Sequence, residues 1–222
     1  MKRHEASLRV LEIASKDGKL SIDDATDIRT GKKQFESEEV FLRKQLAGTS
    51  GVIEVINEND VQKNCITNLS KGSIPREKNI IVDKIGLRFG WSATNVDAAA
   101  VAYSNAEFDL GDVSNDAGVD DTTDTVYARR IPVQVRNAEY VVSVDGIIMD
   151  SGRVADLLTT NVSVDAVNGD AKNFKQLEYP KLFLADKRIK LDIKFPENGA
   201  AVPAGYYYVE FIAKGLGLGK KA

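Results

Sequence analysis

Short runs in which polar and apolar residues alternate recur through most of this 222-residue chain. The clearest is Arg188–Phe195, where charged and apolar residues alternate without a break. A period of two turns one set of side chains to a core and the other to solvent, which predicts half-buried β-strands. The same pattern predicts strands at 52–56, 79–89, 125–136, 161–167 and 206–213, and in the run 79–89 it places Ile81, Ile85, Leu87 and Phe89 on one face.

Turn signals separate these runs. Asp145-Gly146 lies between two β-rich runs in residues 140–149, and this dipeptide is a strong signal for a two-residue hairpin. Residues 92–104 are compatible with a helix or a strand, and Val154–Leu158 predicts a short helix. Helices are not regularly interleaved with the strands, so the pattern indicates a mainly β fold, an antiparallel β-sandwich or barrel.

The two ends of the chain differ from this pattern. Near the N-terminus, Leu8 and Leu11 share one helical face, and Ser37 precedes a run in which Phe41, Leu42 and Leu46 predict a second amphipathic helix. The last residues are rich in glycine and lysine. We therefore expect three parts: an N-terminal helical arm at 1–48 that can be deleted without loss of the fold, a β-sandwich domain at 49–214 and a flexible tail at 215–222.

Groups suited to catalysis are scarce. The chain has one histidine, His4, one cysteine, Cys65, and one tryptophan, Trp91, and it contains no catalytic motif. We therefore predict that it is not an enzyme; a hydrolase that uses two carboxylates alone is the enzymatic alternative. We interpret His4 as an exposed residue without a catalytic role and Cys65 as a buried, unreactive thiol.

Acidic residues are concentrated in one segment. Residues 107–124 contain seven acids and no lysine or arginine, although the whole chain has a net charge of only -3. The oxygen ligands of Asp112, Asp116 and Asp120 are the kind that calcium prefers, so calcium is the one cofactor we consider. The spacing does not match an EF-hand, because Ala117 stands where the loop glycine belongs. A solvated loop and a contact with a basic neighbouring subunit are the other interpretations.

Aromatic residues are candidates for contact with a partner. Trp91 follows the strand predicted at 79–89, and three consecutive tyrosines open the last strand. Neighbouring residues of a strand point to opposite faces, so at least one tyrosine points away from the core or lies at an interface. The same rings also suit a platform for sugars or bases. The candidate interface residues are Phe41, Leu42, Trp91, Tyr206, Tyr207 and Tyr208.

Two classes of partner find little support in the composition. Basic residues occur as the pairs Lys2-Arg3 and Arg129-Arg130 rather than as a patch, so there is no strong signal for nucleic acid. No stretch approaches the roughly 20 apolar residues that a membrane span requires, and the charged N-terminus lacks the apolar region of a secretory signal.

The layout of residues 50–215 resembles that of a viral or bacteriophage jelly-roll coat protein. The resemblance is carried by the strand Arg188–Phe195, the Pro/Gly-rich loop after it and the terminal strand Tyr206–Ala213, with hairpins and a charged arm before them. It implies a single jelly roll that assembles into a virion in the host cytoplasm, beside copies of itself and other virion proteins, with arm and tail exchanged between neighbours. The arm is nearly neutral, whereas arms that contact a genome are commonly basic. The alternative function is a β-sandwich carbohydrate-binding module or adhesin.

Overall fold

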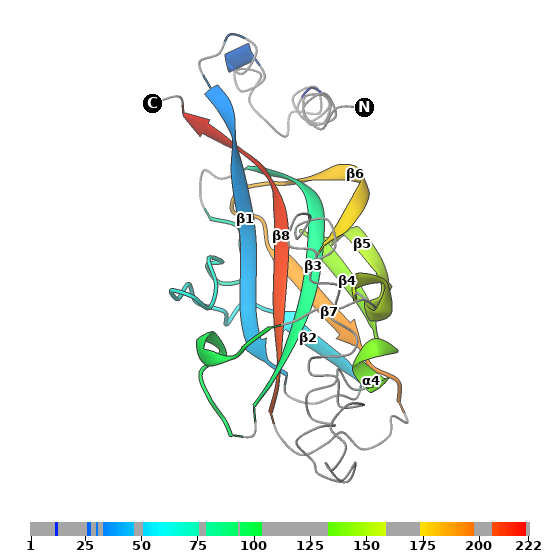
Figure 1. The fold of residues 1–222 in the computed structure, drawn as a ribbon. Helices are drawn as coiled ribbons and strands as arrows, with labels where there is room; N and C mark the ends of the chain where they lie inside the picture. Colours follow the sequence, from blue (N-terminus) through cyan, green and yellow to red (C-terminus); the bar gives the residue numbers. More distant parts are fainter. Residues whose placement is uncertain are drawn as a thin grey trace, which may run out of the picture.

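Two antiparallel β-sheets pack face to face in the computed structural model (Figure 1). The structure describes residues 12, 26–27, 30, 33–46, 51–75, 79–92, 94–103, 133–158, 174–197 and 206–220. The strands are β1 (Lys33–Gln45), β2 (Val52–Ile56), β3 (Ile80–Ser92), β4 (Glu139–Val144), β5 (Ile147–Arg153), β6 (Lys175–Phe183), β7 (Ile189–Lys194) and β8 (Tyr206–Lys220). Short helical turns are η1 (Ala98–Ala100), α4 (Val133–Arg136) and η3 (Val154–Leu157). The prediction of a mainly β fold built from antiparallel sheets is confirmed.

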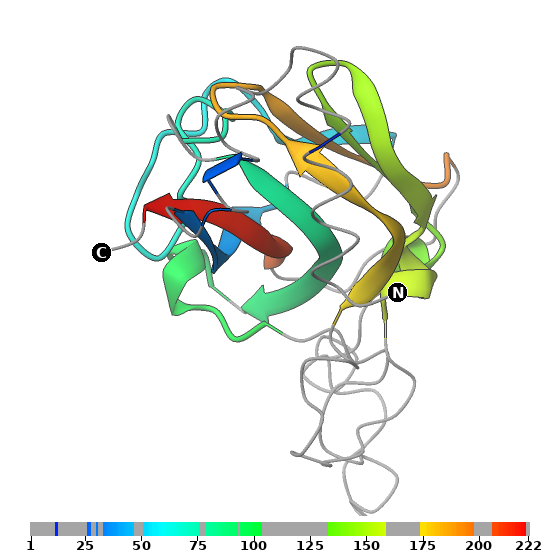
Figure 2. The same cartoon turned by 90° about the horizontal axis from the view of Figure 1, so that it is seen from above.

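The strands of the first half of the chain pair with those of the second half in reverse order. The antiparallel pairs are β1 with β8, β2 with β7, β3 with β6 and β4 with β5. Ladders between β3 and β8 and between β4 and β7 then join these pairs into two sheets. The orders are β1-β8-β3-β6 for the first sheet and β2-β7-β4-β5 for the second. Both views place β5 and β6 on the same side of the sandwich (Figures 1 and 2).

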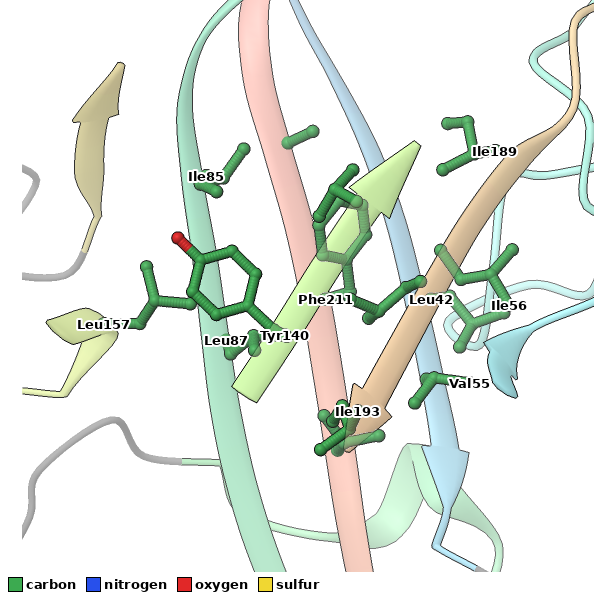
Figure 3. Packing of buried hydrophobic residues seen from close by; sticks show 14 of the residues in the cluster. Leu42, Val55, Ile56, Ile85, Leu87, Tyr140, Leu157, Ile189, Ile193 and Phe211 are labelled. Carbon is green, nitrogen blue, oxygen red and sulfur yellow. The ribbon is translucent and has the colours of Figure 1, made fainter. Parts of the chain in front are cut away.

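The hydrophobic core fills the space between the two sheets (Figure 3). Leu42 of β1, Leu87 of β3 and Phe211 of β8 face it from the first sheet, and Tyr140 of β4 and Ile193 of β7 face it from the second. Each of these five side chains is almost completely buried. Burial of one such side chain contributes about 1.5–3 kcal/mol, so the two apolar faces account for the packing of one sheet on the other.

Several local predictions are confirmed. Strands occur where alternation predicted them at 52–56, 79–89 and 188–195; the first has the predicted bounds, and the bounds of the other two shift by one to three residues. The hairpin forms at Asp145-Gly146, whose φ angles of 52° and 81° are both positive, as a type I′ turn requires. The short helix predicted at 154–158 is the 3₁₀ turn η3. In the ambiguous stretch 92–104 the chain leaves β3 and forms η1, capped by Asp97.

The second helix predicted in the N-terminal arm is wrong. Residues 33–45 form β1, which pairs with β8 along its whole length, from Lys33 opposite Lys220 to Gln45 opposite Tyr208. Val40 and Leu42 are buried in the core, and this period of two outweighs the helical spacing of the apolar residues. Residues 33–45 therefore belong to the sandwich, and a deletion of residues 1–48 would remove one of its strands. The first predicted helix lies almost entirely outside the described residues.

The C-terminal segment is not the flexible tail that its glycines predicted. Strand β8 continues to Lys220 and pairs with β1, and as far as Gly217 it also pairs with β3. A Cβ atom at Gly215 would overlap the backbone of Ile81 and Val82. A glycine therefore occupies this position because two strands approach closely there.

A β-bulge changes the predicted faces of β3. The register with β8 shifts between Val82 and Lys84, so Asp83 is the extra residue. Ile80 and Val82 consequently face the core together with Ile85, whereas Ile81 is buried outside the core cluster. The strand predicted at 125–136 is wrong where it is described, because residues 133–136 form α4; the rest of it and the strand at 161–167 lie outside the described residues.

Candidate functional site

The six candidate interface residues divide between the core and the surface. Leu42 and Tyr207 are buried in the core, and half-buried Trp91 packs against it. Tyr208 points to the outer face of the first sheet but is also buried, so Leu42, Tyr207 and Tyr208 hold this chain together and offer no surface to a neighbour. Phe41 is half-buried on the outer face, and Tyr206 is 37% exposed.

The aromatic residues do not form one stacking platform. Trp91 lies opposite Tyr207 in the β3–β8 ladder, on the core side, whereas Tyr208 is on the other face of β8. The hydroxyl of Tyr208 accepts a hydrogen bond from Val96 N at 3.1 Å and donates one to Val96 O at 2.9 Å. Tyr208 therefore anchors the segment 94–103 against the first sheet, which is a structural role.

A buried carboxylate joins three strands on the outer face of the first sheet. The side chain of Glu210 on β8 is 3% exposed and accepts from Arg43 of β1 at 2.7 Å and from Arg88 of β3 at 3.2 Å. The Arg43 guanidinium also lies over the Tyr103 ring, 5.3 Å from its centroid. Burial raises the pKa of Tyr103 well above its ordinary value. Since each charge here has a partner, this network holds β1, β8 and β3 together and contains no group poised for chemistry.

A second polar cluster bridges the two sheets between β5 and β6. Asp150 Oδ2 accepts a hydrogen bond from the Tyr140 hydroxyl at 2.5 Å and one from Lys175 Nζ at 2.8 Å. Lys175 Nζ also donates to the Tyr140 oxygen at 2.7 Å. Burial, and then the hydrogen bond to Asp150, raise the pKa of Tyr140 well above its ordinary value, so the hydroxyl keeps its proton in alkaline solution as well. Tyr140 and Asp150 belong to the second sheet and Lys175 to the first, so this cluster, which we call the Tyr140–Asp150–Lys175 latch, joins the two sheets. Tyr140 itself is fully buried.

Sequence reasoning missed this latch because of a second bulge. A regular hairpin around Asp145-Gly146 would place Asp150 opposite Val141, on the outer face. The β4–β5 register instead shifts between Val142 and Ser143, and Asp150 lies opposite the buried Val142. The carboxylate thereby comes to the side of the sheet on which Tyr140 lies.

Turns gather around a polar hollow at one end of the second sheet. The hollow has a volume of about 450 Å³ and is lined by Ser73, Ser143, Asp145, Gly146, Asp186, Lys187, Arg188 and Lys190. Its cations already face carboxylates: Lys187 bonds Asp145 at 2.7 Å, and Arg188 bonds Glu58 at 3.2 Å. This pairing leaves little excess positive charge to attract an anion.

The remaining candidates from the sequence are a metal site, His4 and Cys65. Among the described residues, no group of three or more His, Cys, Asp or Glu side chains is placed to hold a metal ion. His4 and the calcium candidates Asp112, Asp116 and Asp120 lie outside the described residues. The prediction that Cys65 is buried is wrong, because its side chain is exposed in a turn where its φ is 63°. None of the described helices has the length and apolar character needed to span a membrane.

The outer edge of β1 is partly covered by a loop that we call the edge plug, residues 66–68. Arg43 N donates to Ile66 O at 2.8 Å, Phe41 N donates to Asn68 Oδ1 at 3.0 Å, and Asn68 Nδ2 donates to Glu39 O at 2.7 Å. These bonds occupy the outer edge of β1 from residue 39 to 43. Edge strands are the part of a sheet that most readily pairs with another chain, so such cover restricts where pairing can occur.

Apolar side chains are exposed on the other edge strands. Val52 lies on β2, Ile147 and Ile148 lie on β5, and Tyr179 lies on β6, and each is more than 60% exposed. Edge strands pair readily with other chains, so apolar groups on them lie where a neighbouring protein can make contact. They are the described surface features that best fit contact with a neighbouring protein.

Comparison with known proteins leaves the chain without an assigned family, since no family model, no curated protein and no solved structure matches it.

Proposed function

We propose that this protein is a non-catalytic structural subunit of a virus or phage particle, folded as a single jelly roll and assembling with copies of itself. The observation that carries the proposal is the strand order. Eight strands pair as β1–β8, β2–β7, β3–β6 and β4–β5 and divide between two four-stranded sheets. A long antiparallel hairpin rolled over itself has this pairing, which is that of a jelly roll, and jelly rolls build viral capsids and lectins.

The surface of the protein supports a role in assembly rather than a role as a monomer. Three edge strands carry exposed apolar residues, and the charged groups around Glu210 and around Asp150 are paired with each other. A shell subunit needs edges and side faces that meet neighbours, and it needs no acid–base site. Copies of the chain are the partners that the proposal requires; other virion proteins, and a location in the virion, follow from it.

The alternative, a carbohydrate-binding module, fits the same architecture because lectins also use jelly rolls. Sugar recognition of this kind relies on exposed aromatic rings. The rings of Trp91, Tyr207 and Tyr208 are on different faces or buried, which leaves Tyr206 as the exposed member of the set. Tyr179 is also exposed on β6, but β3 separates β6 from β8, so the two exposed rings do not lie on neighbouring strands. The described residues therefore favour assembly over sugar binding.

The test is the mass distribution of the purified full-length chain, measured by light scattering over a range of concentrations and checked by electron microscopy. The proposal expects discrete oligomers or shells. Calcium addition and chelation are the second arm, because a calcium-dependent mass would give residues 107–124 a role in assembly. A monomer of 24.2 kDa at every concentration, together with retention on a glycan array that Tyr206→Ala abolishes, would replace the proposal with the sugar-binding alternative.

A further inference from the structure

We propose that β5 is a releasable strand, which opens from β4 while the other strands of the sandwich stay folded, and that the Tyr140–Asp150–Lys175 latch controls how often it opens. Release of β5 frees the edge of β4, the strand that carries the buried residues Tyr140, Val142 and Val144. The inference goes beyond the proposed function, because it concerns the single chain whether or not that chain assembles.

The first step in the argument is the small apolar surface that holds β5. The edges of the two sheets are β1 and β6, and β2 and β5. Leu42 of β1, Ile56 of β2 and Phe183 of β6 are almost completely buried in the core. Each of the seven residues of β5 is exposed or half-buried, and among them Met149 packs against the core. Segments that bury few apolar groups open at a low free energy, so β5 is the edge strand that opens most easily.

The second step is that both ends of β5 are anchored. In the turn before β5, Asp145 N donates to Arg188 O at 2.9 Å. After β5, Val154 N donates to Ala138 O at 2.8 Å, and the side chain of Val154 is fully buried. These two anchors hold the chain on either side of the strand. The opening is therefore confined to β5 and does not spread to the rest of the second sheet.

The third step is the role of the latch. Asp150 lies in the middle of β5 and bonds Lys175 Nζ at 2.8 Å, and the two side chains are 18% and 31% exposed. Lys175 belongs to the other sheet, so this ion pair ties β5 across the sandwich. A largely buried carboxylate without its cation is unfavourable, and release of β5 would return it to water. The ion pair thus opposes release.

The backbone of β4 provides a readout for release. Because Asp145 N bonds Arg188 O and Val154 N bonds Ala138 O, odd-numbered residues of β4 direct their backbone groups to β7 and even-numbered residues direct theirs to β5. The amides of Tyr140 and Val142 therefore face β5, and those of Val141 and Ser143 face β7. Release of β5 exposes only the first pair to water, whereas global unfolding exposes both pairs alike.

Amide hydrogen exchange of the full-length protein, resolved to single residues by mass spectrometry, tests this release. After correction for intrinsic rates, the amides of Tyr140 and Val142 should exchange at least about tenfold faster than those of Val141 and Ser143. Equal protection of the two pairs would overturn the proposal, because the exchange would then occur by an opening that does not separate β5 from β4.

Two lysine variants test the control by the latch. Lys175→Met removes the cation of the latch, and it should accelerate the two amides that face β5 by roughly a further tenfold, with no change in the two that face β7. Lys44→Met is the matched control, because Lys44 pairs with Asp60 at the same 2.8 Å, is 32% exposed and lies on β1, far from β5 in the strand order. It should change neither pair of amides. Equal acceleration of all four amides by Lys175→Met, or none, would refute the role of the latch.

A reversible crosslink tests whether the exchange requires β5 to separate from β4. Val141 and Ser151 lie opposite each other in the β4–β5 ladder at a position that is not hydrogen-bonded, where a Cα separation of about 4.5 Å permits a disulfide. In a Cys65→Ser background, Val141→Cys with Ser151→Cys should slow the amides that face β5 to the rate of those that face β7 after oxidation. Reduction should restore the faster exchange. Fast exchange that persists in the oxidised protein would overturn the proposal.

Discussion

Replacement of Gly215 by alanine is expected to destabilise the protein strongly, because this glycine lies where β8 meets the bulge in β3. A Cβ atom at this position would lie 2.8 Å from Val82 Cα and 2.6 Å from the Ile81 carbonyl carbon, closer than real Cβ atoms approach. The atoms that it meets belong to the backbone, so relief requires the two strands to separate. Overpacking of this kind costs about 1–3 kcal/mol or more, and the gain from a stiffer unfolded chain offsets about 0.4–1 kcal/mol. We expect a net loss of about 2 kcal/mol.

Two other glycines provide matched controls. At Gly152 a Cβ atom would make ordinary contacts at 3.5 Å, so Gly152→Ala should change the free energy of unfolding by less than about 0.5 kcal/mol. At Gly217 the nearest atoms belong to the Glu38 side chain, which can move, so Gly217→Ala should lie between the two.

Urea denaturation of the three variants measures these differences. The midpoint for Gly215→Ala should fall with an unchanged slope, and the thermal midpoint should fall by roughly 4–8 °C. If the three alanine variants were equally stable, Gly215 would not be packed between strands. Residues 215–220 would then be the flexible tail that their composition predicts, and the argument from close backbone approach would be refuted.

Three further predictions concern other parts of the fold. Leu42→Ala should lower the free energy of unfolding by about 2–5 kcal/mol and Phe41→Ala by clearly less, because Leu42 is buried in the core and Phe41 is half-buried outside it; equal losses in urea denaturation would contradict β1 as a strand. Burial raises the pKa of Tyr207 from 10.0 to about 12, so its contribution to stability is complete below about pH 10 and is lost as the pH rises through 12. The urea midpoint of the wild type should therefore fall more over this range than that of Tyr207→Phe, and parallel curves would show that burial does not perturb Tyr207. The exposed thiol of Cys65 should react with an aromatic disulfide reagent within about tenfold of its rate in the unfolded chain, and strong protection would contradict its exposure.

Strands with an unbroken period of two could be predicted from the sequence alone. β7 and the hairpin at Asp145-Gly146 depend on local signals, namely alternation and a dipeptide that accepts two positive φ angles. The mainly β class follows from these signals and from the lack of interleaved helices. The scarcity of histidine and cysteine also limits the possible chemistry, whatever fold the chain adopts.

The candidate sites were less predictable because they depend on register. One extra residue at Asp83 and another in β5 each move the following side chains to the opposite face. The Tyr140–Asp150–Lys175 latch exists because of the second of these bulges, and its residues come from three strands. No spacing in the sequence shows where an extra residue enters a ladder.

By itself, the sequence determined that this chain would fold into short antiparallel strands around an apolar core, because alternation and turn chemistry act between near neighbours. Tertiary structure alone decided that residues 33–45 form a strand and not a helix, and that the glycine-rich end continues β8. These two segments are far apart in the sequence, since Lys33 begins the first strand and Lys220 ends the last. They stabilise each other only when they pair. Their conformation therefore depends on a contact between distant parts of the chain, and the residues near each segment in the sequence carry no information about that contact.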